Sequence, residues 1–277
     1  MKSTKIALVQ MQATFGNIDK NLSTLEKFIN EAAAQQAEII CFPEMCIQGY
    51  SREIPDFLLQ SIDGEAILFL KKLAQNKGIT IIAGMAEKCL NKRPFITQVV
   101  IRPGQNIDYY RKTHLGNSEQ PYYQAGNEIK TFSTEKTTIG IQICWDTHFP
   151  EMTTILSLRG AEVIFAPHAS PTIVGDRKAI WLKYLAARAY DNSVFLAACN
   201  LVGDDGNGRQ FCGGSMVIDP KGNVLAEDFE GKQSMLVVDL DCAQINAIRE
   251  RKSSSMANSF FLANRRPEIY KDLLRIF

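Results

Sequence analysis

The sequence contains no long hydrophobic run. A membrane-spanning helix needs about 18 or more consecutive apolar residues, and the longest apolar stretches here are short segments such as Val194–Cys199. The apolar segment Ile6–Val9, which follows Lys2 and Lys5, is much shorter than the core of a secretory signal peptide. We therefore expect a cytoplasmic protein with no membrane partner.

The sequence also lacks an excess of charge. Its 31 Lys and Arg residues balance 30 Asp and Glu residues, which gives a net charge of +1. Nucleic-acid binding depends on clustered cations that neutralise phosphates, and a balanced chain creates no overall field that attracts polyanions. The composition therefore predicts no nucleic-acid partner.

A disulfide framework and a structural zinc site are both missing. The seven cysteines are an odd number in a chain of 277 residues, which is too long to need disulfides for stability. Cys41 and Cys46 have no second close Cys or His pair at zinc-site spacing. Because a thiol in an apolar strand behaves as a small hydrophobic group, the cysteine count alone identifies no functional residue.

Alternating strand and helix patterns are present along most of the chain, with 45% hydrophobic residues. They predict an α/β protein with mixed sheets, as one domain at residues 4–245 and a C-terminal extension at 246–277. Turn sequences at Arg102–Gln105 and Asp219–Asn223 predict two hairpins. The predicted strands are Ile6–Gln10, Glu38–Phe42, Ile79–Met85, Ile96–Ile101, Thr138–Ile143, Glu162–Ala166, Val194–Asn200, Met216–Ile218 and Met235–Leu240. The predicted helices are Asp19–Gln36, Glu65–Asn76, Pro150–Arg159 and Arg177–Asp191.

Reactive side chains directly follow apolar strands at three places. Glu44 comes after one strand, Lys112 and His114 after a second, and Cys144 after a third. Strand ends in α/β proteins commonly carry functional sites. Taken singly, however, Glu44 could be a surface carboxylate, Lys112 could lie on a solvated sheet edge, and Cys144 could be an inert buried thiol.

Together the three segments resemble the nitrilase superfamily of carbon–nitrogen hydrolases. They read F-P-E, R-K-x-H-L and I-C-W-D-x-x-F-P-E, and they occur in this order. Further matching segments are Trp181–Asn192, Phe211–Gly222 and Arg265–Tyr270. The resemblance implies a four-layer α-β-β-α sandwich with two mixed β-sheets, association as a homodimer with the extension at a subunit interface, and no cofactor or metal.

The resemblance also implies a Glu-Lys-Cys catalytic set, Glu44, Lys112 and Cys144. A thiolate divides the hydrolysis of an unreactive amide into two lower barriers, which makes Cys144 the expected nucleophile. Glu44 would accept the thiol proton, and Lys112 would favour the negative charge that results. The backbone N–H of Trp145 and the Lys112 ammonium are expected to stabilise the oxyanion.

Four other side chains are candidates for supporting or substrate-binding roles. The resemblance places a positioning carboxylate at Glu119 and a substrate-facing residue at His148. From the residues alone, His148 could instead pair with Cys144, four residues earlier on a helix face. Tyr123 could line the pocket or pack its loop, and His168 could contact substrate or be an ordinary loop histidine.

We therefore expect a cofactor-free hydrolase that cleaves a small amide or N-carbamoyl compound and releases ammonia. A nitrilase that converts a nitrile to a carboxylic acid is the alternative enzyme. A catalytically silent interaction module with the same fold is an alternative of another class. The intact Glu44, Lys112 and Cys144 argue against the silent module.

Overall fold

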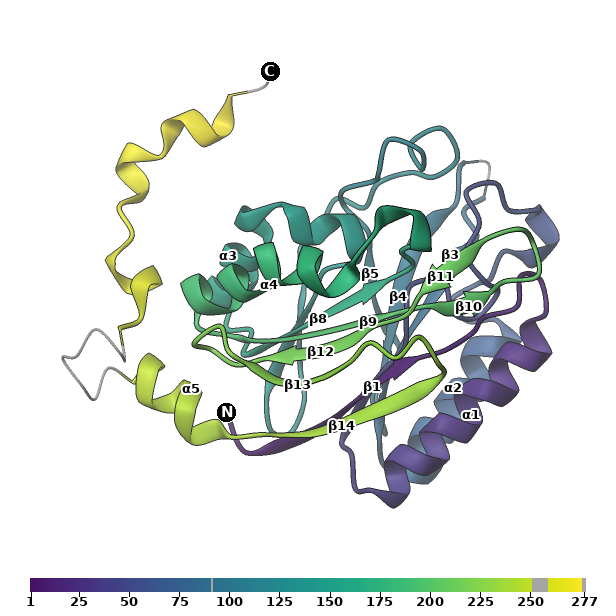
Figure 1. Ribbon diagram of the computed structural model, residues 1–277, viewed down its shortest axis with the longest axis horizontal. Coiled ribbons are helices and arrows are strands. Elements are labelled where there is room, and N and C mark those ends of the chain that lie inside the picture. Colours follow the sequence, from purple (N-terminus) through teal and green to yellow (C-terminus); the bar gives the residue numbers. More distant parts are fainter. Residues whose placement is uncertain (91, 251–258, 276–277) are drawn as a thin grey trace.

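Two six-stranded sheets pack face to face in the computed structural model, and helices cover the outer face of each (Figure 1). The structure describes residues 1–90, 92–250 and 259–275. The layers follow the order helix, sheet, sheet, helix, so the predicted four-layer α-β-β-α sandwich with two mixed β-sheets is confirmed.

The first sheet has the strand order β14-β1-β2-β3-β4-β5. Strands β1, β2 and β3 are parallel, whereas the other neighbours pair antiparallel. Helices α1 (Ile18–Ala34) and α2 (Glu65–Lys77) cover its outer face (Figure 1). The strands are β1 (Thr4–Gln10), β2 (Ile39–Cys41), β3 (Thr80–Glu87), β4 (Phe95–Ile101), β5 (Asp108–Arg111) and β14 (Ser234–Leu240).

The second sheet has the strand order β13-β12-β9-β8-β7-β6. Helices α3 (Pro150–Leu158) and α4 (Arg177–Asn192) cover its outer face (Figure 1). Its strands are β6 (Thr131–Ser133), β7 (Thr138–Ile141), β8 (Val163–His168), β9 (Phe195–Asn200), β12 (Ser215–Ile218) and β13 (Val224–Asp228). The remaining elements are a small hairpin of β10 (Val202–Asp204) and β11 (Gln210–Cys212), and helix α5 (Cys242–Arg249).

The alternation of side chains along β8 shows why the layers separate. Phe165 packs in the main core, which includes the space between the sheets, whereas Ala166 packs on the opposite face with Trp181 and Leu185 of α4. Successive side chains of a strand point to opposite faces, so a strand that is apolar on both faces requires a sheet on one side and a helix on the other. The side chains of β8 thus belong to the main core on one face and to smaller clusters beneath α4 and α3 on the other.

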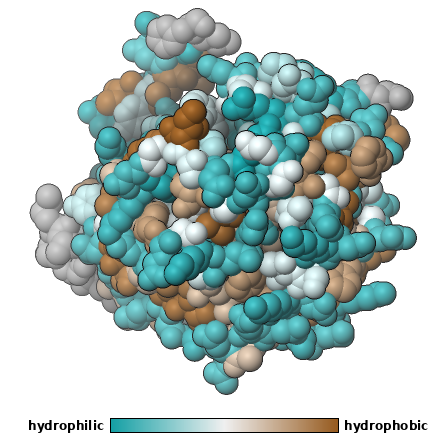
Figure 2. Space-filling view, turned by 45° about the vertical axis from the view of Figure 1, so that its right-hand side comes forward, coloured by the Kyte–Doolittle hydropathy of each residue, from teal (hydrophilic) through white to brown (hydrophobic). Residues whose placement is uncertain are grey.

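The predicted strands and helices are all present in the structure, each within a few residues of its predicted limits. The two predicted hairpins connect β4 to β5 and β12 to β13. None of the helices in the described part of the chain is both long and apolar enough to span a bilayer. The face of the molecule in Figure 2 is largely hydrophilic, with hydrophobic side chains in small separate groups.

The C-terminal segment extends away from the two sheets as a series of short turns (Figure 1). Its first described turn, Phe261–Asn264, contacts α4 through Phe261, whose ring lies 5.5 Å from that of Tyr190. Helix α5 runs across the expected boundary between residues 245 and 246. The division into 4–245 and 246–277 stays a prediction, and residues 251–258 and 276–277 of the extension lie outside the described residues.

Candidate active site

The three strand ends that the sequence singles out meet at one edge of the sandwich. Glu44 follows β2, and Lys112 follows β5, which runs in the same direction as β2. The Lys112 Nζ lies 2.7 Å from the Glu44 Oε1, and each side chain is only 1% exposed. Cys144 follows β7 in the other sheet, close enough for Lys112 to influence the pKa of its thiol. The site therefore contains parts of both sheets.

A glycine in the neighbouring strand allows Glu44 to reach this position. Gly84 of β3 lies directly beside the segment Pro43–Met45, and a Cβ atom on Gly84 would lie 2.3 Å from the Met45 backbone nitrogen. Real Cβ atoms do not approach backbone this closely, so a side chain at this position would displace the segment. The close approach fixes the path of the chain through Glu44.

Glu119 joins the ion pair as a second carboxylate. Its Oε1 accepts hydrogen bonds from the Lys112 Nζ at 2.9 Å and from the Tyr50 hydroxyl at 2.9 Å. Its Oε2 accepts a hydrogen bond from the Gly116 backbone N–H at 2.8 Å. Lys112 is thus held between two buried carboxylates, and Glu119 is itself fixed by two other donors. Sequence reasoning gave no reason to expect Tyr50 here.

Burial and pairing set the charges of this cluster. Burial opposes the positive charge of Lys112, but Glu44 and Glu119 outweigh it and raise the lysine pKa well above its ordinary value. Burial raises the pKa of Glu44 to about 7, against the opposing effect of Lys112. The Glu44 Oε2 is buried and has no hydrogen-bond partner in the described structure. Glu44 therefore exchanges a proton easily near neutral pH.

Cys144 occupies a strained position on a tight turn. It has a φ of 45°, in the left-handed region that non-glycine residues rarely adopt, and it begins the 3-10 helix Cys144–His148. Its Sγ lies 3.8 Å from the Ser170 Oγ. Burial raises the pKa of Cys144 to about 12, with a further increase from Glu44 and an opposing effect of Lys112. The resting thiol is protonated, so a base must remove its proton before it can react.

Asp146 connects the Cys144 turn to the lysine segment. Its carboxylate accepts hydrogen bonds from the Ile143 N–H at 3.0 Å and from the His114 N–H at 2.8 Å. It also accepts from the Tyr110 hydroxyl at 2.8 Å and the Thr113 hydroxyl at 3.0 Å. Hydrogen bonds to a buried carboxylate are short and strong. Asp146 therefore fixes the distance between the two sheets beside the cysteine.

His148 and Trp145 lie on the outer side of the cysteine turn. The His148 ring centroid is 4.9 Å from that of Trp145 and 4.6 Å from that of Tyr184 in α4. No hydrogen bond joins the His148 ring to Cys144 in the described part of the chain, so a papain-like Cys-His pair is not formed. Burial lowers the pKa of His148, and the Arg188 charge lowers it further.

His168 and Tyr123 are both buried. The His168 Nδ1 lies 2.8 Å from the Ala166 carbonyl oxygen, and burial lowers its pKa well below the ordinary value, so the ring is neutral. The Tyr123 hydroxyl donates to the Ser51 carbonyl oxygen and lies 3.9 Å from the Met45 sulfur. Tyr123 thus packs the segment next to Glu44, and His168 packs beneath α4.

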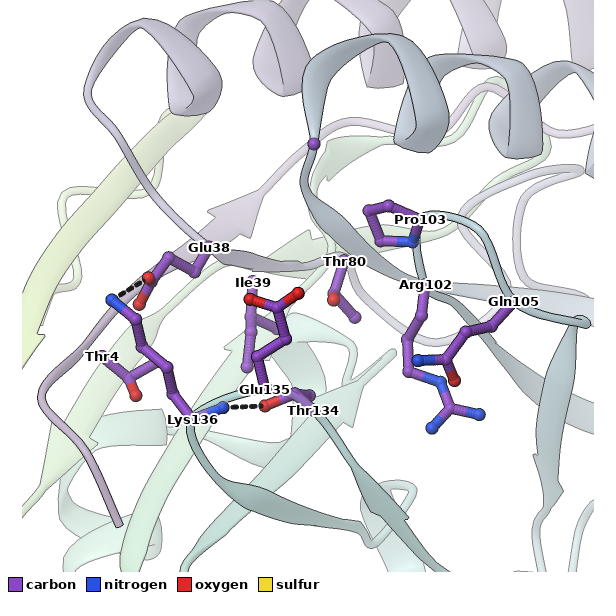
Figure 3. Close-up of a pocket in the computed structure, with 11 residues that line it drawn as sticks. Thr4, Glu38, Ile39, Thr80, Arg102, Pro103, Gln105, Thr134, Glu135 and Lys136 are labelled. Carbon is purple, nitrogen blue, oxygen red and sulfur yellow. Dashed lines mark hydrogen bonds and ion pairs between the residues drawn. The ribbon is translucent and has the colours of Figure 1, made fainter.

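A separate pocket lies at the opposite ends of the strands (Figure 3). It has a volume of about 260 Å³, and its walls include Glu38, Arg102 and Lys136. These charges are already paired, Lys136 with Glu38 and Arg102 with Asp108. No group of three or more His, Cys, Asp or Glu side chains in residues 1–90, 92–250 and 259–275 could hold a metal ion. The chemistry is therefore concentrated at the edge that carries Cys144.

This fold and this site together define a hydrolase of the α-β-β-α class. Residues 5–250 match the carbon-nitrogen hydrolase family, and the chain belongs to that family. It is an enzyme that acts on amides.

Known proteins resemble the chain over nearly its full length. A nitrilase of Pyrococcus abyssi is 30% identical, covering 96% of this chain and 98% of the relative. The 2-oxoglutaramate amidase of Bacillus subtilis is 32% identical, and the match covers 88% of this chain and 93% of the relative. A solved structure of an amidase variant of Nesterenkonia sp. AN1 superimposes on this chain with a TM-score of 0.83 at 25% identity. The match covers 98% of this chain and 97% of that one. The variant carries the acetamide moiety of fluoroacetamide, added covalently at its active-site cysteine. The resemblance drawn from the sequence is confirmed.

Proposed function

We propose that the enzyme hydrolyses a small linear amide or N-carbamoyl compound through a thioester on Cys144 and releases ammonia. The observation that carries the proposal is the position of Lys112, paired with Glu44 at 2.7 Å and with Glu119 at 2.9 Å beside the Cys144 turn. This arrangement supplies a nucleophile, a base and a cation within one buried cluster. No metal or cofactor enters the proposed reaction.

In the first half of the proposed reaction, Glu44 removes the thiol proton as the sulfur attacks the amide carbon. The carbonyl π electrons move to oxygen, and the Lys112 ammonium and the Trp145 backbone N–H stabilise that negative charge. Collapse of the tetrahedral intermediate breaks the C–N bond, and Glu44 donates its proton to the departing nitrogen. The products are ammonia and an acyl-thioester.

In the second half, Glu44 accepts a proton from water as the water oxygen attacks the thioester carbon. Collapse of this intermediate expels the sulfur, which recovers a proton from Glu44, and the acid is released. Glu119 does not enter either step. Through its bonds to Tyr50 and Gly116 it positions Lys112 and holds it charged.

A substrate panel tests the proposed function. The purified protein is incubated with linear amides, N-carbamoyl amines, N-carbamoyl amino acids and nitriles, and ammonia and carbon dioxide are both measured. Ammonia without carbon dioxide identifies an amidase, whereas release of both identifies a carbamoylase. Turnover of nitriles in preference to the matching amides would favour the nitrilase alternative, which the 30% identical nitrilase of Pyrococcus abyssi supports. Absence of turnover on every class would contradict the proposal.

The pH dependence of kcat/KM tests Glu44 as the base. Because the free enzyme must present Glu44 ionised and its pKa is raised to about 7, kcat/KM should fall about tenfold per pH unit below that value. Lys112 stays charged throughout this range. A neutral, non-titrating amide is used so that the profile reports the enzyme. A constant kcat/KM between pH 5 and 8 would exclude this role.

The resemblance also leads us to propose a homodimer in the cytoplasm. Sedimentation velocity of the full chain distinguishes the dimer from a monomer.

A further inference from the structure

Arg177 is a buried cation that has no counterion among the residues that the structure describes. It is the first residue of α4 and is 8% exposed. No carboxylate pairs with it in the described structure, and its buried Nε has no hydrogen-bond partner. A buried charge is costly unless it is paired or hydrogen-bonded. The guanidinium therefore retains unused capacity to bind an anion.

The carboxylates near Arg177 are engaged elsewhere. Asp176 accepts a hydrogen bond from the Ala179 N–H at 3.0 Å as the N-cap of α4, and Glu227 pairs with Lys178. The neighbours that Arg177 does contact are neutral. Its guanidinium carbon lies 5.9 Å from the Trp181 ring, and Tyr184 lies seven residues further along α4, on the same face of the helix.

Arg177 lies on the same side of the molecule as the cysteine. The Tyr184 ring lies 4.6 Å from that of His148, which ends the 3-10 helix that Cys144 begins. The Trp181 ring, which lies beside Arg177, is 4.8 Å from the His168 ring. Burial lowers the pKa of both His148 and His168, and the Arg177 charge lowers each further. Figure 1 shows α4 over β8, the strand whose C-terminal end leads through Ser170 towards α4. Cys144, Tyr184 and Arg177 thus follow one another from the nucleophile to the start of α4.

We infer that Arg177 binds a carboxylate on the substrate, at the end remote from the scissile amide. The inference rests on the proposed function and narrows it to amides that carry a carboxylate at their other end. A guanidinium binds a carboxylate through two parallel hydrogen bonds, which fixes both the position and the direction of the bound group. The neutral His148 and His168 rings and the Tyr184 hydroxyl add no negative charge that would repel the carboxylate.

Matched substrate pairs test the inference. Succinamate is compared with 4-methylpentanamide, and glutaramate with 5-methylhexanamide, so that an isopropyl group replaces the carboxylate at constant shape. We expect the wild-type kcat/KM to be at least about tenfold higher for the better carboxylated amide than for its neutral partner. Arg177→Met should lower kcat/KM for the carboxylated amide by about 10- to 100-fold and change the neutral amide by less than about twofold.

Two further variants complete the design. Arg177→Lys keeps the charge but not the paired hydrogen bonds, so it should fall between wild type and Arg177→Met. Lys178→Met removes the adjacent cation, which faces Glu227 rather than the site, and should match wild type on every substrate. An equal loss on charged and neutral amides in Arg177→Met would indicate a structural role and overturn the inference. Preference of the wild type for the neutral amides would also overturn it, while the proposed function would stand.

Binding to an inactive protein separates the inference from the proposed function. Succinate is titrated calorimetrically into Cys144→Ala, alone and combined with Arg177→Met or Lys178→Met. We expect succinate to bind to Cys144→Ala. Adding Arg177→Met should raise the dissociation constant of succinate at least about tenfold, and adding Lys178→Met should leave it unchanged. If succinate binds in this way but the wild type turns over no amide, the carboxylate site is supported and the hydrolytic proposal is rejected. If succinate does not bind, or binds equally to all three proteins, the carboxylate site is rejected.

Discussion

Cys144→Ala is expected to lower kcat on the best amide by at least about 10⁴-fold, because the proposed acyl intermediate forms on the Cys144 sulfur. Glu44, Lys112 and Glu119 keep their mutual hydrogen bonds in this variant. Its thermal unfolding midpoint should therefore stay close to that of the wild type. Steady-state ammonia release and circular dichroism measure the two properties.

Cys89→Ala is the matched control for this prediction, since Cys89 is another partly exposed free thiol and lies outside the cluster. It should retain wild-type turnover. A brief treatment of the wild type with substrate, followed by acid quenching and intact mass measurement, should show one acyl group per chain. Retention of turnover by Cys144→Ala to within tenfold of the wild type would mean that another residue is the nucleophile.

Lys112→Met is expected to reduce both stability and activity. Removing the cation leaves Glu44 and Glu119 buried without their shared partner, a change that typically costs about 3–5 kcal/mol in the free energy of unfolding. The loss should grow as the pH rises from 5 to 8, because the ionised carboxylates are the forms that need the cation. We expect kcat/KM to fall by at least about 10²-fold through loss of oxyanion stabilisation. Urea unfolding at several pH values measures the first effect.

A double variant separates the two consequences of losing Lys112. Lys112→Met combined with Glu119→Gln removes one of the facing carboxylates, so it should recover part of the lost stability. It should not recover activity, because the cation beside the substrate oxygen is still missing. Recovered activity in the double variant would show that Lys112 acts only by compensating buried charge.

The fold was largely predictable because its central strands are apolar on both faces. Strands such as β3 and β9 are buried throughout, which produces continuous runs of hydrophobic residues. The turn before strand β13 was predicted but the limits of the strand were not, because it is an edge strand whose side chains are exposed or partly exposed. Strand β6 was not predicted because it has only three residues.

The site was predictable at Glu44, Lys112 and Cys144 because each lies in a motif directly after a strand. The contacts that hold these three residues in place were not predictable from the sequence. Tyr50 reaches Glu119 across 69 positions of sequence, and Tyr110 reaches Asp146 across 36. Arg177 stands out only when its lack of a counterion becomes visible in three dimensions. Such relations depend on how the strands pair, and no local pattern encodes them.

The division of the cluster between the sheets has a consequence for folding. Glu44 and Lys112 follow strands of one sheet, whereas Cys144 follows a strand of the other. Neither sheet alone brings the thiol to the lysine. The first sheet is itself complete only when β14 pairs with β1, which joins Thr4 to Leu240. During refolding, recovery of turnover should therefore report the docking of one sheet on the other, as a later event than the formation of either.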